Sequence, residues 1–208
     1  MSERPHPDRF YPIVDGLGWL QRLVRLGVGT AQLRAKGLGP DEATGLVVQA
    51  LAITGGTATR LVVNDYWQAA IEAGAAHLHL GQEDLAEADI PAIRRAGLTL
   101  GLSTHDEEEL ETALRHDPTY VALGPIYPTT LKAMRFAPQG LDRIGAWKRR
   151  VGRVTLVAIG GITLERAPGV FGAGADSIAV VSDVTQNPDP DGRVRDWLSF
   201  AGSGPAGG

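Results

Sequence analysis

The stretch TLGLSTHDEEELETALRHDPTYVALGP, residues 99–125, contains one complete repeat of the fold. Residues 99–104 and 120–125 are short β-rich runs, whereas residues 106–116 have apolar residues at the spacing of an amphipathic helix. Two strands joined by a helix in this way are typical of a βαβ unit, whose strands are parallel. The stretch therefore predicts one unit of a parallel α/β fold.

The same alternation extends along the chain in both directions. The β-rich runs occupy residues 10–15, 30–36, 60–65, 77–81, 99–104, 120–125, 155–161 and 177–182. A helical pattern follows each run, and together they predict an α/β fold, a single-domain (β/α)8 TIM barrel over residues 10–200. Residues 1–9 and 201–208 are expected to be flexible ends. An open doubly wound sheet is the alternative, which the missing GxGxxG motif after the first run disfavours.

Composition narrows the class of protein. The 208 residues include no cysteine, which excludes disulfide bonds and thiolate chemistry. A net charge of −4 argues against a nucleic-acid partner. No apolar run approaches the ~18 residues of a membrane span, and the first residues lack the apolar core of a secretory signal. We expect a cytoplasmic protein that acts on small molecules; the sequence is compatible with a homo-oligomer.

Polar residues gather where the predicted strands end, which is where barrels place their active sites. In the run 30–36, alternation puts Gln32, Arg34 and Lys36 on one face and apolar residues on the other. Because the outer face packs on helices, the polar face should line the barrel mouth. Two cations there need an anion, either a ligand or the carboxylates of an internal salt-bridge layer.

Two aspartates follow neighbouring strands of the predicted barrel. Asp65 ends the run 60–65, and Asp84 follows the run 77–81. Adjacent parallel strands lie ~4.8 Å apart, so the two carboxylates could share Mg²⁺, which commonly uses one or two carboxylates with substrate phosphate oxygens. The alternative is that both residues are helix N-caps.

Histidines and glycines add two further candidates. His77 and His79 form an HxH pair, which can bind zinc, although packed and hydrogen-bonded barrel histidines are the expected role. Gly160 and Gly161, with the pair Val181-Ser182, end the last two strands. Barrels often bind phosphate there through backbone N–H groups, whereas the alternative is a glycine pair that only turns the chain.

The loop GPIYPTTLKAM, residues 124–134, has the hydroxyls and the ammonium group that an anion site needs. Thr129, Thr130 and Lys132 can all donate hydrogen bonds, whereas Leu131 between them cannot. The loop predicts a phosphate contact that lacks one expected donor.

These blocks, taken in order, resemble the thiamine phosphate synthase family over residues 10–186. The blocks are QLRAK, VVNDYW, HLHLGQEDL, GLSTHD, GPIYPTTLK, APQGL, VAIGGIT and IAVVS. The resemblance implies an enzyme that joins a pyrimidine diphosphate to a thiazole phosphate, carboxylated or plain, and releases diphosphate. Diphosphate would leave first, and the thiazole nitrogen would then attack the pyrimidine cation.

The resemblance also implies residue roles. The pyrimidine diphosphate would contact Gln32, Arg34, Lys36, Asn64, Ser103 and Lys132. Asp65 and Asp84 would hold Mg²⁺. The thiazole phosphate would contact Thr129, Thr130, Leu131, Gly161, Val181 and Ser182. The catalytic residues would be Arg34, Lys36, Lys132 and Ser103.

Two positions depart from the family pattern. Leu131 replaces a threonine of Pro-Thr-x-Thr-Lys, and Gly37 replaces the aspartate that often follows QLRxK. Two rival functions remain. A thiazole tautomerase would need a histidine where Pro125 stands, and would have no use for the two aspartates. A non-catalytic phosphate-binding barrel is favoured only by Leu131.

Overall fold

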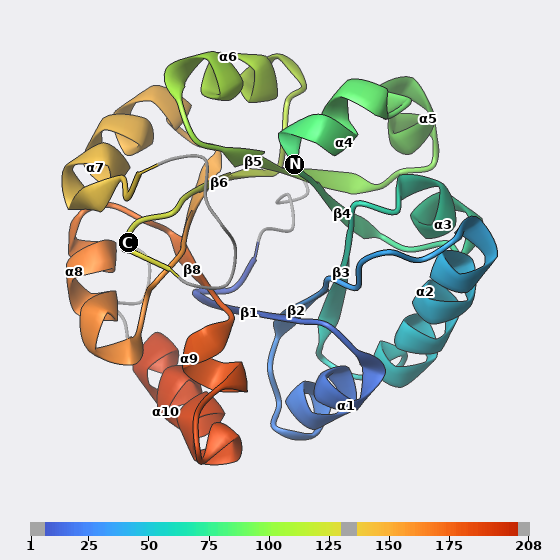
Figure 1. The fold of residues 1–208 in the computed structure, drawn as a ribbon, viewed down its shortest axis with the longest axis horizontal. Helices are drawn as coiled ribbons and strands as arrows, with labels where there is room; N and C mark the ends of the chain where they lie inside the picture. Colours follow the sequence, from blue (N-terminus) through green and yellow to red (C-terminus); the bar gives the residue numbers. More distant parts are fainter. Residues whose placement is uncertain (1–6, 130–136, 204–208) are drawn as a thin grey trace.

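The computed structural model describes residues 7–129 and 137–203. Eight parallel strands close into a barrel in sequence order, from β1 to β8, and β8 pairs with β1. Figure 1 looks onto the end of the barrel at which the strands finish, with the helices arranged in a ring outside. The strands are β1 (Phe10–Val14), β2 (Thr30–Leu33), β3 (Arg60–Asn64), β4 (His77–Leu80), β5 (Thr99–Thr104), β6 (Tyr120–Leu123), β7 (Thr155–Ile159) and β8 (Ser177–Val180). The predicted TIM barrel is confirmed.

The helices cover the outer surface of the barrel. They are α1 (Leu17–Arg25), α2 (Pro40–Thr54), α3 (Trp67–Glu72), α4 (Gln82–Glu87), α5 (Ile90–Arg95), α6 (Glu107–Arg115), α7 (Gly140–Val151), η1 (Leu164–Arg166), α8 (Ala167–Gly172), α9 (Ser182–Thr185) and α10 (Pro190–Gly202). The short helices α4 and α9, which the sequence patterns did not predict, follow the ends of β4 and β8. No helix in the described part of the chain is long and apolar enough to cross a membrane.

Alternation along each strand divides the interior into two cores. Leu100 and Leu102 point outward into a large apolar core between the strands and the helices. Tyr120 and Val157 instead belong to a small apolar core inside the barrel. Burying one leucine stabilises the fold by about 1.5–3 kcal/mol, so the outer core supplies most of the apolar stabilisation. The small inner core leaves room for polar residues nearer the mouth.

The second strand is shorter than the sequence predicts. The run 30–36 was expected to be strand throughout, but β2 ends at Leu33. The Arg34 backbone N–H still donates to the Val14 carbonyl at 2.8 Å, and the chain then turns away, with Gly37 at φ +73°. Alternation therefore fails beyond Arg34, and Lys36 is exposed in the loop after β2.

The lower end of the barrel, at which the strands begin, is connected to the segment before β1. The Thr30 hydroxyl donates to the Asp8 carboxylate at 2.9 Å, and Arg60 forms an ion pair with the same carboxylate at 2.7 Å. Asp8 lies in the segment expected to be a flexible end, and the limits of the domain remain a prediction.

Candidate active site

Four polar side chains line the inside of the barrel near the ends of neighbouring strands. Gln32, Asn64 and His79 are buried, with 2%, 3% and 7% of their surfaces exposed, and Ser103 is partly exposed above them. The strand register explains this grouping. Gln32 lies beside Val62 on β3, which is two positions before Asn64 and on the same face, and Asn64 lies beside His79 on β4. Burying these groups is costly unless they are hydrogen bonded to protein or ligand. Their position marks the mouth as the candidate site.

Asp65 leaves the end of β3 in a strained conformation. Its φ is +63°, in the left-handed region that few residues other than glycine adopt. The Asp65 N–H donates to the His79 carbonyl at 2.9 Å, which ties the turn to β4. A non-glycine residue in this region costs about 1–3 kcal/mol, and such strain is commonly found at functional sites.

Asp65 and Asp84 lie next to each other. Burial, together with the charge and the hydrogen bond of Asp84, raises the pKa of Asp65 to about 6, against the opposing effect of Arg34. Neither carboxylate caps a helix, because the N-caps of α3 and α4 are Tyr66 and Gly81. The N-cap alternative is therefore wrong for both. Two adjacent carboxylates at a barrel mouth form a donor set that could hold a hard cation such as Mg²⁺.

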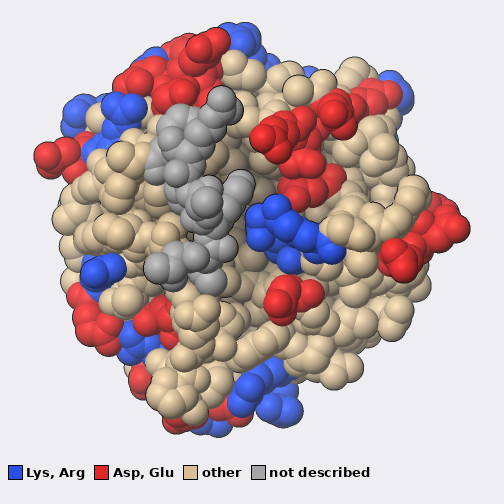
Figure 2. All heavy atoms as spheres, in the orientation of Figure 1, with Lys and Arg blue, Asp and Glu red and all other residues tan. Residues whose placement is uncertain are grey.

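Arg34 supplies the positive charge at the mouth. It is close enough to lower the pKa of both Asp65 and His79, yet it forms no ion pair with any described residue. Its side chain is partly buried, which makes an unpaired guanidinium costly without a bound anion. The internal salt-bridge layer, the alternative for Gln32, Arg34 and Lys36, is thus not formed within the described chain. Figure 2 shows basic side chains near the centre of this face, with acidic side chains on two sides.

The Asn64 side chain is buried next to Asp65. Its side-chain nitrogen forms no hydrogen bond of good geometry with any described residue, although the Asn64 side chain lies close enough to the Asp65 carboxylate to lower the pKa of Asp65. Buried donors are nearly always satisfied, so such an atom beside a cation and a carboxylate pair indicates a place for a ligand oxygen or nitrogen.

A chain of buried hydrogen bonds crosses the barrel below the mouth. The Gln32 amide nitrogen donates to the Tyr11 hydroxyl at 2.7 Å, and this hydroxyl lies 2.9 Å from that of Tyr120. The Tyr120 hydroxyl lies 2.9 Å from His79 Nδ1, and His79 Nε2 lies 2.9 Å from Ser103 Oγ. Burial lowers the pKa of His79 to about 4, so the ring is neutral.

Sequence reasoning missed this chain and the role of the glycine that permits it. A Cβ atom at Gly101 would lie 2.0 Å from the Tyr120 ring, so only glycine lets this ring cross the barrel. The lone glycine inside the run 99–104 was the available signal, because it marks a close approach.

Two other histidines, His77 and His105, have ordinary structural partners. His77 Nδ1 lies 2.8 Å from the Thr99 hydroxyl at the lower end of the barrel, and His105 Nδ1 lies 2.7 Å from Glu109. Within the described chain, no group of three or more His, Cys, Asp or Glu side chains could hold a metal. The HxH pair is therefore a packed pair and forms no zinc site with described residues.

The loop after β7 packs tightly against the loop after β6. Gly160 and Gly161 have φ of +99° and +63°, and a Cβ atom at Gly161 would lie 2.4 Å from the Pro128 carbonyl oxygen. The Tyr127 N–H donates to the Gly160 carbonyl at 3.0 Å. Thr129 lies at the end of this described segment, whereas Thr130, Leu131 and Lys132 lie outside the described residues. The glycine pair therefore allows close loop packing as well as a turn.

The backbone N–H groups of Gly161 and Ser182 lie just beyond the ends of β7 and β8. Neither the Gly161 nor the Ser182 N–H donates a hydrogen bond to any described residue. Val181, between β8 and α9, has a φ of −120° and a ψ of −82°. Free backbone donors with glycine beside them suit a phosphate group.

Arg193 on α10 links the segments that carry these two N–H groups. Its guanidinium forms two hydrogen bonds of 2.8 Å with Asp183, which follows Ser182, and one of 2.9 Å with Glu165, four residues after Gly161. Trp197 Nε1 also donates to Asp183, at 2.7 Å. This arrangement, which the sequence did not predict, braces the two loops from outside the mouth.

Comparisons with known proteins identify the family of this chain. The family described as thiamine monophosphate synthase matches residues 10–184. The thiamine-phosphate synthase of Rhizobium etli is 57% identical over 192 residues, which cover 92% of this chain and 94% of that protein. That of Cronobacter sakazakii is 49% identical over 200 residues, 96% of this chain and 95% of that protein.

Solved structures confirm the fold independently. A thiamine phosphate pyrophosphorylase from Pyrococcus furiosus superposes with a TM-score of 0.81 at 23% identity, covering 93% of this chain and 95% of that one. A 3-hexulose-6-phosphate synthase gives a TM-score of 0.63 at 15% identity, over 92% and 98% of the two chains. At these identities the superpositions show the barrel alone, whereas the match along residues 10–184 and the close relatives carry the assignment. The chain therefore belongs to the thiamine monophosphate synthase family and is a transferase.

Proposed function

We propose that the mouth joins 4-amino-2-methyl-5-hydroxymethylpyrimidine diphosphate to a thiazole phosphate, by a dissociative displacement assisted by Mg²⁺. The observation that carries the proposal is the partly buried Arg34, which forms no ion pair with any described residue and lies beside the Asp65–Asp84 pair. A guanidinium without an ion pair among the described residues, next to two carboxylates, matches a diphosphate bound with a divalent metal. Conversion of the carboxylated thiazole would in addition release CO2.

Breaking the bond between the methylene carbon and diphosphate leaves negative charge on the leaving group. Arg34 is suited to stabilise that charge, and Lys36 and Lys132 are assigned the same role from the family resemblance. The resulting pyrimidine cation is stabilised by its own amino group until the thiazole nitrogen forms the new C–N bond. No protein nucleophile is needed for this displacement.

The residues present fit a magnesium ion. Asp65 and Asp84 are adjacent carboxylates, and the strained backbone at Asp65 directs one of them to this position. When bound, magnesium supplies positive charge to the diphosphate oxygens. Asn64, whose side-chain nitrogen forms no hydrogen bond of good geometry with a described residue, would then face the pyrimidine diphosphate together with Gln32 and Ser103.

The thiazole phosphate would bind on the opposite side of the mouth. The N–H groups of Gly161 and Ser182, which donate to no described residue, support a phosphate position there. Val181, Thr129, Thr130 and Leu131 complete the proposed contacts through the family resemblance. The two substrates would thus meet above the inner core, with the diphosphate side and the thiazole side of the mouth held by different strands.

The proposal is tested by incubating the purified protein with both substrates, with and without Mg²⁺. We expect equal amounts of thiamine phosphate and diphosphate, and no product when either substrate or the metal is left out. Binding of thiazole phosphate without any product would instead favour the non-catalytic barrel. A change of the thiazole without the pyrimidine substrate would favour the tautomerase.

Leu131→Thr should lower the KM for thiazole phosphate severalfold with little change in kcat. A neutral hydroxyl donor contributes about 0.5–1.5 kcal/mol, which corresponds to up to roughly tenfold in binding. Steady-state kinetics at saturating pyrimidine diphosphate measure the effect. An inactive wild type that Leu131→Thr restores would contradict the proposal that the natural protein is an active enzyme.

Arg193→Gln should raise the KM for thiazole phosphate about tenfold, equivalent to ~1.4 kcal/mol, and leave the KM for pyrimidine diphosphate unchanged. The glutamine cannot form the paired hydrogen bonds to Asp183 or reach the charge of Glu165, so the two phosphate-binding loops lose their brace. Arg150→Gln is the matched control, because Arg150 forms an ion pair with Glu111 between α7 and α6. Equal KM changes for both substrates would contradict a local role.

A further inference from the structure

In the buried series of hydrogen bonds from Gln32 to Ser103, one can work out which group donates in each bond. Because the Gln32 amide nitrogen donates to the Tyr11 oxygen, the Tyr11 proton is left for its other partner, the Tyr120 oxygen. Tyr120, having accepted that proton, donates its own to His79 Nδ1. A neutral imidazole that accepts at Nδ1 carries its proton on Nε2, which then donates to Ser103 Oγ.

Burial favours this order, although Gln32 also lies close to the Tyr120 hydroxyl. Tyr11 and Tyr120 are 1% and 4% exposed, and burial raises the pKa of both phenols, so each keeps its proton. The two rings meet edge to face, with centroids 6.0 Å apart, and the His79 ring stacks on that of Tyr120 at 5.5 Å. These contacts leave the hydroxyl groups few alternative partners.

We infer that Tyr120 is a positioning residue that makes Ser103 a hydrogen-bond donor and Gln32 a hydrogen-bond acceptor toward the substrate. Ser103 Oγ accepts from His79, so its own proton is free for a ring nitrogen or a phosphate oxygen. The Gln32 nitrogen is engaged by Tyr11, so its amide oxygen is free for an amino group. A substrate with both an amino group and adjacent acceptors, as an aminopyrimidine diphosphate has, matches this pattern.

With this order of donors and acceptors, Ser103 has no general base. A Ser–His pair at 2.9 Å resembles the start of a nucleophilic triad, but here the nitrogen that faces the serine already carries a proton. His79 cannot remove the Ser103 proton, so Ser103 binds and does not attack. This agrees with a displacement that uses no protein nucleophile.

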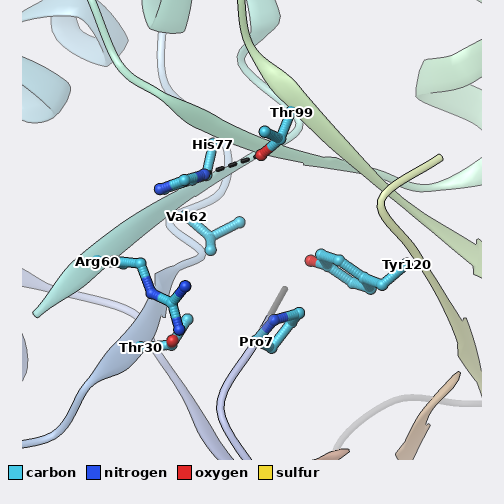
Figure 3. A pocket seen from close by; sticks show the side chains of 7 residues that line it. All are labelled: Pro7, Thr30, Arg60, Val62, His77, Thr99 and Tyr120. Atoms are coloured by element: carbon cyan, nitrogen blue, oxygen red, sulfur yellow. Dashed lines mark hydrogen bonds between the residues drawn. The ribbon is translucent and has the colours of Figure 1, made fainter. Parts of the chain in front are cut away.

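The lower end of the barrel offers a matched control. Figure 3 shows a pocket there, lined by Pro7, Thr30, Arg60, Val62, His77, Thr99 and Tyr120, in which His77 bonds to Thr99. The Thr99 side chain contacts neither Gln32 nor Ser103 in any described hydrogen bond. Thr99→Val thus removes a hydroxyl–histidine hydrogen bond of the same kind without altering the hydrogen bonds that run from Gln32 to Ser103.

The direction is tested by ¹⁵N nuclear magnetic resonance of the whole protein labelled at its five histidines, with His79→Gln to assign the signal. At neutral pH we expect His79 to be the Nε2–H tautomer in the wild type and in Thr99→Val. In Tyr120→Phe the ring loses its Nδ1 partner, and a mixture of tautomers is expected. An Nδ1–H tautomer in the wild type, or an unchanged ring in Tyr120→Phe, would overturn the inference.

Kinetics then test the consequence, which rests on the proposed function. Tyr120→Phe should raise the KM for pyrimidine diphosphate about threefold to tenfold and leave the KM for thiazole phosphate unchanged, as expected for hydrogen bonds that are weakened and not abolished. A role in stability alone would lower the melting temperature and leave both KM values as in Thr99→Val, which would overturn the positioning role. A wild type without synthase activity would refute the proposed function. The tautomer of His79 would still decide which group donates in each hydrogen bond from Gln32 to Ser103.

Discussion

Asp84→Ala and Asp65→Asn should each lower kcat by about 100-fold to 1000-fold and raise the magnesium concentration needed for half-maximal activity. The reason is that two adjacent carboxylates are few for a divalent ion, so the loss of either removes a large part of the protein's contribution to the site. The charge on the leaving diphosphate then lacks its strongest counterion, and losing one such stabiliser costs 10²–10³ in rate. Steady-state rates over a magnesium titration, at saturating substrates, measure both effects.

The control for these variants is Asp89→Asn. Asp89 is an aspartate that does cap a helix, because its carboxylate accepts from the Ala92 N–H at 2.9 Å at the start of α5. Asparagine is an equally good N-cap, so this variant should keep the wild-type rate and magnesium dependence. Wild-type activity of both Asp65→Asn and Asp84→Ala at low magnesium would show that these residues hold no metal.

Arg34→Ala should lower kcat by about tenfold to a thousandfold. Arg34 is the described cation that lies beside the carboxylate pair without an ion pair of its own, and its charge should act most strongly on the leaving diphosphate. Lys132→Ala is expected to behave similarly, on the basis of the family resemblance. The measurement is kcat and KM for both substrates, with circular dichroism to verify the fold.

Arg60→Ala separates a local effect from a general loss of positive charge. Arg60 begins β3 at the opposite end of the barrel, where it pairs with Asp8, so its loss should leave kcat unchanged. If Arg34→Ala raises only KM, Arg34 contributes uniform binding and does not stabilise the leaving group. Lys36 is exposed, and we expect a smaller effect from its removal than from that of Arg34.

Features carried by local pattern were predictable from the sequence. Alternation identified which faces of the strands point inward, and the eight repeats closed into the predicted barrel. Polar residues at the strand ends lie together around the mouth, and Asp65 and Asp84 are neighbours, as expected. The limit of this reasoning is visible at Lys36, where the strand ends three residues before the predicted boundary and alternation no longer applies.

Features that depend on how the barrel closes were not predictable in this way. The hydroxyls of Tyr11 and Tyr120 meet although 109 positions separate them, because the rings cross the interior from different strands. Arg193 reaches two loops that approach each other only when β7 and β8 are neighbours. The two tyrosines are residues typical of a core, and Arg193 is typical of a helix surface. Only their proximity to the site in three dimensions gives them a role there.

The most direct test of the account is a crystal structure of the protein with thiamine phosphate, diphosphate and Mg²⁺. We expect the metal between the Asp65 and Asp84 carboxylates and the diphosphate, with Arg34 on the diphosphate oxygens and the product phosphate on the Gly161 and Ser182 N–H groups. Metal or diphosphate bound elsewhere, with Asp65 and Asp84 still paired only to each other, would contradict the proposed site.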